Sequence, residues 1–129
     1  MFRQGILFLL AAGVAIPALA ETSTVNSLFQ ADVDDVSNQE IVVLEVTYPP
    51  GVESARHRHN AHTIVYVLEG AVTMQVAGGE KKALAAGQVF YETPDDIHSV
   101  SMNASETEPA KILVFFLKEK GAPTTEPAS

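Results

Sequence analysis

Short runs rich in β-branched residues alternate with turn signals along most of this chain, and this rhythm limits the possible folds more than any other feature. Turn pairs such as Glu69-Gly70, Gly78-Gly79 and Ala86-Gly87 separate the runs at regular intervals. Short strands with turns at such spacing are typical of all-β sandwiches and barrels. We therefore predict an all-β fold whose strands cover residues 40–48, 56–59, 63–68, 71–76, 82–84, 89–92, 97–102 and 111–118.

Length, charge and cysteine content restrict the class of protein further. The chain has 129 residues, which suits a single domain. It contains no cysteine, so disulfides, thiolate metal sites and cysteine nucleophiles are excluded. Its 16 acidic residues outnumber 8 basic ones, for a formal net charge of −8. A surface of this charge repels a phosphate backbone, and we expect no nucleic-acid partner.

Residues 1–20 have the pattern of a secretion signal. Arg3 precedes an apolar run from Gly5 to Leu19, and Ala18-Leu19-Ala20 forms a small-residue cleavage site before Glu21. A membrane anchor is the alternative, but the apolar run is shorter than the about 20 residues that a spanning helix needs. We therefore predict cleavage after Ala20, a periplasmic or secreted location, and no membrane association of the mature protein.

The rest of the chain divides into three parts. Residues 21–39 are polar and acidic and form either a loose arm or an edge strand, residues 40–120 form the barrel, and the Pro- and Thr-rich residues 121–129 are expected to be disordered.

Several runs, such as residues 64–68 and 112–116, are apolar on both faces, which favours a homodimer that covers the outer face. The predicted core residues are Ile41, Val43, Val46, Val65, Val67, Val72, Met74, Val89, Phe90, Ile112, Val114 and Phe116.

Three of the four histidines lie within six residues, in the run Arg56-His57-Arg58-His59-Asn60-Ala61-His62. Residues two apart on a strand point to the same face, so His57 and His59 can aim at one point inside a barrel. Two imidazoles placed in this way can share a metal ion. His62 has the opposite parity and would need a local bulge to point inward.

The sequence around these histidines resembles the cupin family, in particular small single-domain cupins of the quercetin-dioxygenase-like cupin-2 type. Five residues separate Gly51 from His57-Arg58-His59, and the run ends at Gly70 in Tyr-Val-Leu-Glu-Gly, as in the first cupin motif. Gly87, Pro94 and His98 have the spacing of the second motif, with Asn103 following. The resemblance covers residues 41–117 and implies a double-stranded β-helix, or jelly-roll, barrel.

The resemblance implies that His57, His59 and His98 bind one divalent transition metal, which could be Fe, Mn, Zn, Ni or Cu. Where the family usually has a carboxylate ligand, this chain has Thr63. The fourth ligand could instead be His62, Glu92 or water. Glu92 and His62 are also the candidate catalytic proton acceptors. Thr63 and Tyr66 are the candidate residues for contacting a bound ligand.

These features predict a small metal-binding cupin, most simply a metal-dependent, dioxygenase-like enzyme acting on a small organic molecule. A non-catalytic periplasmic protein that binds a metal or a small ligand is the alternative, and a cupin isomerase or lyase is another. Because one fold hosts many chemistries, the resemblance supports the metal more strongly than the reaction.

Overall fold

The computed structural model describes residues 21–129, and the predicted secretion signal at residues 1–20 lies outside the described residues. Ten β-strands make up the regular structure of the described part, which contains no helix long and apolar enough to cross a membrane. The strands are β1 (Thr24–Asp32), β2 (Gln39–Tyr48), β3 (His57–Arg58), β4 (Ala61–Glu69), β5 (Ala71–Val76), β6 (Lys82–Ala85), β7 (Val89–Glu92), β8 (Ile97–Asn103), β9 (Ala110–Glu119) and β10 (Glu126–Pro127).

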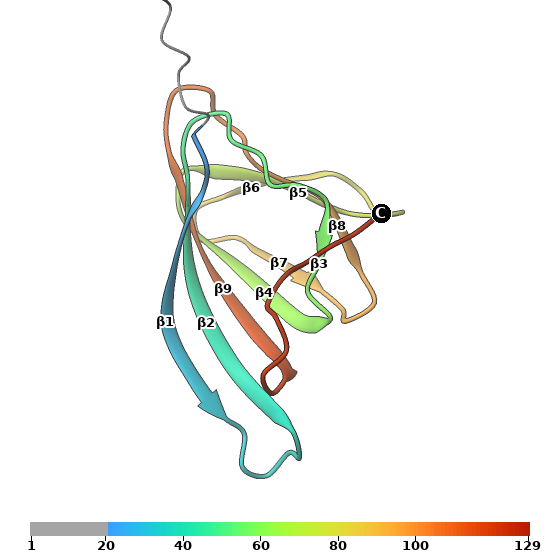
Figure 1. The fold of residues 1–129 in the computed structure, drawn as a ribbon. Helices are drawn as coiled ribbons and strands as arrows, with labels where there is room; N and C mark the ends of the chain where they lie inside the picture. The colour runs from blue at the N-terminus through green and yellow to red at the C-terminus, as the bar shows by residue number, and fades with distance from the viewer. Residues whose placement is uncertain (1–20) are drawn as a thin grey trace, which may run out of the picture.

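Two antiparallel five-stranded sheets form the fold (Figure 1). The first has the order β1-β2-β9-β4-β7 and the second has the order β10-β3-β8-β5-β6. Sequential strands repeatedly cross from one sheet to the other, as in a jelly roll. The predicted all-β barrel is confirmed, and so is the strand at residues 71–76 to the residue.

The core lies between the sheets and follows the alternation of each strand. Val65, Val67, Val72 and Met74 are almost completely buried. Three predicted core residues are wrong, because Ile41 and Val89 are 39% and 54% exposed and Val43 is only half-buried, at an outward position of β2. In β2 the inward positions are the even-numbered Val42, Val46 and Tyr48, which turns Ile41 to the outer face. In β7 the inward positions are Phe90 and Glu92, which turns Val89 outward.

Gly70 ends the run Tyr66–Gly70 for a steric reason. Its φ of 72° places it in the left-handed region, which a residue with a Cβ rarely adopts. A Cβ at this position would lie 2.6 Å from the carbonyl oxygen of Pro109. The turn from β4 to β5 therefore requires glycine here.

Both ends of the described chain pair with strands of the barrel. Of the two alternatives for residues 21–39, the structure has the edge strand, because β1 pairs with β2. The expected disorder of residues 121–129 is wrong, because β10 pairs with β3 and Asn60 donates a 2.8 Å hydrogen bond to Glu126. Composition shows that this tail cannot build a core, but adding a strand requires only backbone hydrogen bonds.

A buried ion pair holds the base of this tail. Lys118 donates to Oε1 of Glu40, and the backbone N–H of Gly121 donates to the same oxygen across 3.1 Å. The hydrogen bond from Lys118 is the main reason that the pKa of Glu40 falls from 4.5 to about 2. The carboxylate therefore stays ionised and fixes the point at which the tail leaves β9.

Candidate metal centre

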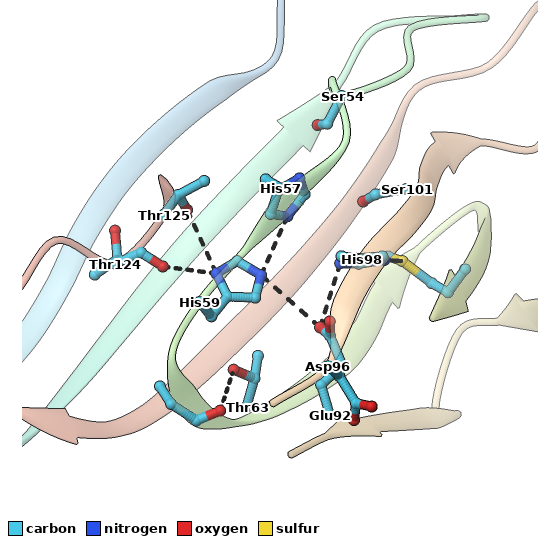
Figure 2. Close-up of polar contacts among 12 residues, drawn as sticks. Ser54, His57, His59, Thr63, Glu92, Asp96, His98, Ser101, Thr124 and Thr125 are labelled. Atoms are coloured by element: carbon cyan, nitrogen blue, oxygen red, sulfur yellow. Dashed lines mark hydrogen bonds and ion pairs between the residues drawn. The ribbon is translucent and has the colours of Figure 1, made fainter. Parts of the chain in front are cut away.

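His57, His59 and His98 come together inside the barrel, as predicted from the motifs. His57 lies on β3 directly opposite His98 on β8, and His59 follows β3. One ring nitrogen from each residue lies within 4.8 Å of the others. The residues His57 and His98 are 9% and 3% exposed, and the side chain of His59 is 11% exposed. Figure 2 shows the three rings facing one another.

Backbone carbonyls determine which nitrogens of two rings carry protons. Nδ1 of His57 lies 2.7 Å from the carbonyl oxygen of Ala55, and Nδ1 of His59 lies 2.6 Å from that of Thr124. A carbonyl oxygen can only accept, so each Nδ1 donates. In the neutral rings, each Nε2 therefore carries a lone pair, and the two Nε2 atoms lie 3.2 Å apart.

Two lone pairs that face each other at this distance repel unless a cation lies between them. Burial is the largest influence on both rings and lowers the pKa of His57 and of His59, so a second proton is disfavoured on either ring. Two imidazole nitrogens that each lie about 2.1 Å from one metal ion are roughly 3.0–3.4 Å apart. The observed separation of 3.2 Å fits this arrangement.

Glu92 brings a carboxylate to the same cluster. Its residue is 2% exposed, and its Oε2 lies 3.2 Å from Nδ1 of His98 and 3.8 Å from Nε2 of His59. Oε2 of Glu92 and Nδ1 of His98 are the buried side-chain polar atoms of the described chain that lack a hydrogen-bond partner. Buried polar atoms rarely remain unpaired. Imidazole nitrogens beside an unpaired carboxylate oxygen are a donor set that fits a divalent transition ion.

His98 makes one further contact, with Met74. Its Nε2 lies 3.1 Å from the sulfur Sδ of Met74. When Nε2 donates to this weak acceptor, Nδ1 carries the lone pair that faces Glu92. In that tautomer the third ring also directs an unprotonated nitrogen toward the cluster, whereas in the other tautomer a protonated Nδ1 faces Oε2 of Glu92 across 3.2 Å.

Glu92 supplies a carboxylate next to the position where the first motif has Thr63. Thr63 lies directly opposite Glu92 in the β4–β7 pair, and both residues are buried on the same face. The Thr63 hydroxyl donates to the carbonyl of Ala61 on its own strand across 3.3 Å. The carboxylate that the first motif lacks thus reaches the cluster from the neighbouring strand. The hydroxyl of Thr63 remains engaged within β4.

His62 and Tyr66 lie on the outer face of the sheet, away from the cluster, so the structure does not bring these two predicted site residues to the histidines. β4 alternates without interruption past these residues, and its register shift comes later, between Val67 and Glu69. No bulge therefore turns His62 inward. His62 is exposed and its Nδ1 lies 2.7 Å from the hydroxyl oxygen of Tyr91, while Tyr66 is 38% exposed.

A cavity of about 420 Å³ adjoins the three histidines. Its walls are mainly apolar, with hydroxyl groups from Tyr48, Ser54 and Ser101 and tail residues Thr124 and Thr125. Sequence reasoning missed these residues. Tyr48 and Ser101 read as ordinary strand residues, and Thr124 contributes a backbone carbonyl, which leaves no signal in the side-chain pattern.

Asn103 supports the neighbouring loops. Its Nδ2 donates to the carbonyls of Tyr48 and Glu108 across 3.1 Å and 2.8 Å, and its Oδ1 accepts from the N–H of Ser105 across 2.9 Å. The side chain thereby ties the end of β2 to the loop that follows β8.

Known proteins resemble this chain in both sequence and fold. The "Beta-alanine degradation protein BauB" of Pseudomonas aeruginosa is 35% identical over 75 residues, which cover 57% of this chain and 78% of that protein. A cupin-like protein from Thermotoga maritima superposes with a TM-score of 0.64 at 22% identity, over 83% of this chain and 76% of that one. DMSP lyase DddQ from Ruegeria pomeroyi superposes with a TM-score of 0.60 at 18% identity, over 71% of this chain.

The lyase is much longer than this chain, which spans 44% of its length, and the likeness shows the fold alone. The family model for the cupin domain, Cupin_2, matches residues 44–116, from the middle of β2 to the inward-facing Phe116 of β9. This match includes all three clustered histidines and Glu92. The chain therefore belongs to the cupin-2 family.

Proposed function

We propose that this protein is a metal-dependent enzyme that acts on a small organic molecule, with His57, His59 and His98 holding one divalent transition ion. The observation that carries this proposal is the 3.2 Å approach of two ring nitrogens whose partner nitrogens both donate to carbonyls. The cavity of about 420 Å³ beside these rings supports catalysis over storage, since a storage site has no need of a pocket for a second molecule.

Each residue of the site has a distinct task in this proposal. When bound, a divalent ion supplies Lewis acidity, which polarises a substrate oxygen and stabilises developing negative charge. The carbonyls of Ala55 and Thr124 hold His57 and His59 in the tautomer that presents Nε2. Apolar walls such as Val114 and Phe116 offer no hydrogen-bond partners to water in the cavity.

Glu92 is the proposed proton acceptor. Its Oε2 is buried and lies 3.2 Å and 3.8 Å from ring nitrogens of His98 and His59, which line the cavity, so it is the carboxylate placed to accept a proton from the side of the histidines. Glu92 is not part of the group of atoms that lie within 4.8 Å of one another, which favours this role over that of a fourth ligand.

For the reaction we propose oxygen-dependent, dioxygenase-like turnover. Support for this type comes from the resemblance of the motifs to quercetin-dioxygenase-like cupins. Consumption of candidate substrates by the metal-loaded protein under air and under argon tests it. Equal turnover under both gases would assign a lyase or isomerase instead, whereas an absence of turnover in a metal-loaded protein would assign a non-catalytic binding role.

The metal itself is tested with four single variants. We expect His57→Ala, His59→Ala and His98→Ala to lose most of the bound metal, because two imidazoles hold the ion poorly. His62→Ala is the matched control and should retain it, since His62 lies on the outer face. Metal content of the folded variants is measured by elemental analysis. Equal metal content in all four proteins would refute the site.

A further inference from the structure

Three hydroxyl groups form a cluster in the same cavity as the histidines. Oη of Tyr48 lies 2.8 Å from Oγ of Ser101, and Oγ of Ser54 donates to the same Oη across 3.3 Å. Tyr48 and Ser101 are 4% and 3% exposed. In Figure 2, Ser54 and Ser101 lie at the opposite end of the histidine cluster from Glu92.

A β-bulge explains how His98 and Ser101 both face the cavity although three positions separate them. On β5, neighbouring residues Gln75 and Val76 pair with Val100 and His98, so β8 contains one extra residue at Ser99. The alternation therefore shifts by one after His98. Without this shift, Ser101 would point to the other face of the sheet.

The three hydroxyl groups have one more hydrogen-bond donor than the hydrogen bonds among them require. Three hydroxyls carry three protons, and the two hydrogen bonds among them consume two. Whichever way the bond between Tyr48 and Ser101 runs, one of these two buried hydroxyls keeps a free O–H. Within residues 21–129 the structure gives this O–H no other acceptor, and a buried donor without an acceptor costs free energy. A ligand that brings an acceptor oxygen would satisfy it.

The rest of the cavity restricts that ligand. Its walls next to the cluster are aliphatic and include Leu44, Val46 and Ile112. Arg56 is the only Lys or Arg among the lining residues of the described chain, and it is exposed at the rim. A carboxylate at the hydroxyl cluster would therefore have no positively charged side chain beside it, and a metal ion at the histidines would be its only counter-charge, besides Arg56 at the rim, among the groups that line the cavity, which favours an uncharged acceptor.

We propose that Tyr48, Ser54 and Ser101 form a subsite for an uncharged acceptor oxygen, such as a carbonyl, of a small substrate with a largely apolar body. The inference rests on the proposed function only in calling this ligand the substrate. In that case a second oxygen of the substrate would approach the histidines. The hydroxyl cluster selects for the acceptor oxygen, and the aliphatic walls select for the apolar body.

Two probes of similar shape test the subsite, namely acetophenone, which has a carbonyl, and ethylbenzene, which has none. Each is titrated into the full-length protein and into the double variant Tyr48→Phe/Ser101→Ala, with binding followed by protein NMR. We expect the variant to bind acetophenone about three- to ten-fold more weakly, as for the loss of one hydrogen bond. Ethylbenzene should bind both proteins equally. An equal effect on both probes, or no binding of acetophenone to the wild type, would overturn the proposal.

A second measurement needs only the wild type, and it tests the subsite even if the double variant does not fold. The carbonyl ¹³C resonance of labelled acetophenone should move downfield on binding to the wild type, as it does when a carbonyl accepts a hydrogen bond, and an unchanged resonance would also overturn the proposal. Both titrations are run with protein as purified and after chelation. If the protein takes up no divalent metal but still selects the carbonyl probe, the metal proposal fails and the subsite stands. If the protein binds metal but shows no carbonyl selectivity before or after chelation, the subsite fails and the metal proposal stands.

Discussion

The tail that follows β9 offers a sharp test of how His59 is positioned. Deleting residues 123–129 removes β10 and the Thr124 carbonyl that accepts from Nδ1 of His59 across 2.6 Å. The cut keeps the hydrogen bonds from the N–H groups of Gly121 and Ala122, to Glu40 and Glu119, so the base of the tail stays anchored. The expected consequence is a ring that can rotate and adopt either tautomer.

The size of the effect follows from these contacts. Losing one neutral hydrogen bond costs about 0.5–1.5 kcal/mol, and ordering one freed side chain on binding costs about 0.5–1.5 kcal/mol more. The sum of roughly 1–3 kcal/mol corresponds to a loss of metal affinity of about 5- to 150-fold. This range includes the about 10- to 100-fold loss typical of removing such a supporting partner of a metal-binding histidine.

The assay is a competition titration of Zn²⁺ between the protein and a chromophoric chelator, for the full-length chain and the deletion variant. Deletion of Ser129 alone is the matched control, because it leaves Thr124, the pairing of β10 with β3 and the hydrogen bond from the N–H of Ala128 to the carbonyl of Arg56 in place. We expect the control to stay within about two-fold of the full-length chain, since surface changes of this kind have small effects. If the longer deletion binds Zn²⁺ as tightly as the control does, the Thr124 carbonyl does not position His59.

Further predictions concern the carboxylate, pH, the outer face and the N-terminus. Glu92→Gln should keep its metal by elemental analysis and lose turnover, and loss of the metal would make Glu92 a ligand. Burial lowers the pKa of His57 and His59 below the usual 6.5, so protons bind the unfolded chain preferentially. The metal-free protein should be fully stabilised above pH 6.5 and lose stability as the pH falls below it, and a urea midpoint that rises on acidification would contradict this. The apolar outer face around Phe115, which is 37% exposed, should form a homodimer, against which light scattering of a micromolar monomer would count. Mass spectrometry of exported protein should find Glu21 at its N-terminus, and an intact Met1 would refute cleavage.

The residues that sequence reasoning placed correctly are those whose position follows from strand parity. His57 and His59 share a face because two positions separate them, and His62 lies on the other face because β4 continues its alternation past it. The alternative of a bulge at His62 could not be rejected from sequence, since one extra residue in a strand leaves little compositional trace. The bulge that does affect the site lies in β8, after His98, where the sequence drew no attention to it.

What the sequence could not predict depends on pairing between distant segments. The carbonyl of Thr124 acts on His59 through the backbone, so any residue type at that position could serve. Ser101 likewise shows its role only once Tyr48 is known to lie 2.8 Å away. Such contacts link positions 53 and 65 residues apart, beyond the reach of any local pattern.

The carboxylate that the first motif lacks has a counterpart on the neighbouring strand. Thr63 occupies the motif position that usually carries the acid, and Glu92 is its direct partner across the β4–β7 ladder. Partners in such a ladder have Cβ atoms about 4.5–5.5 Å apart on the same face. The side chain of Glu92 on β7, which is longer than that of Thr63, can therefore reach the region that a carboxylate on β4 would have occupied. A search for the acid along β4 alone would find none, whereas the register of the two strands places one next to His59 and His98.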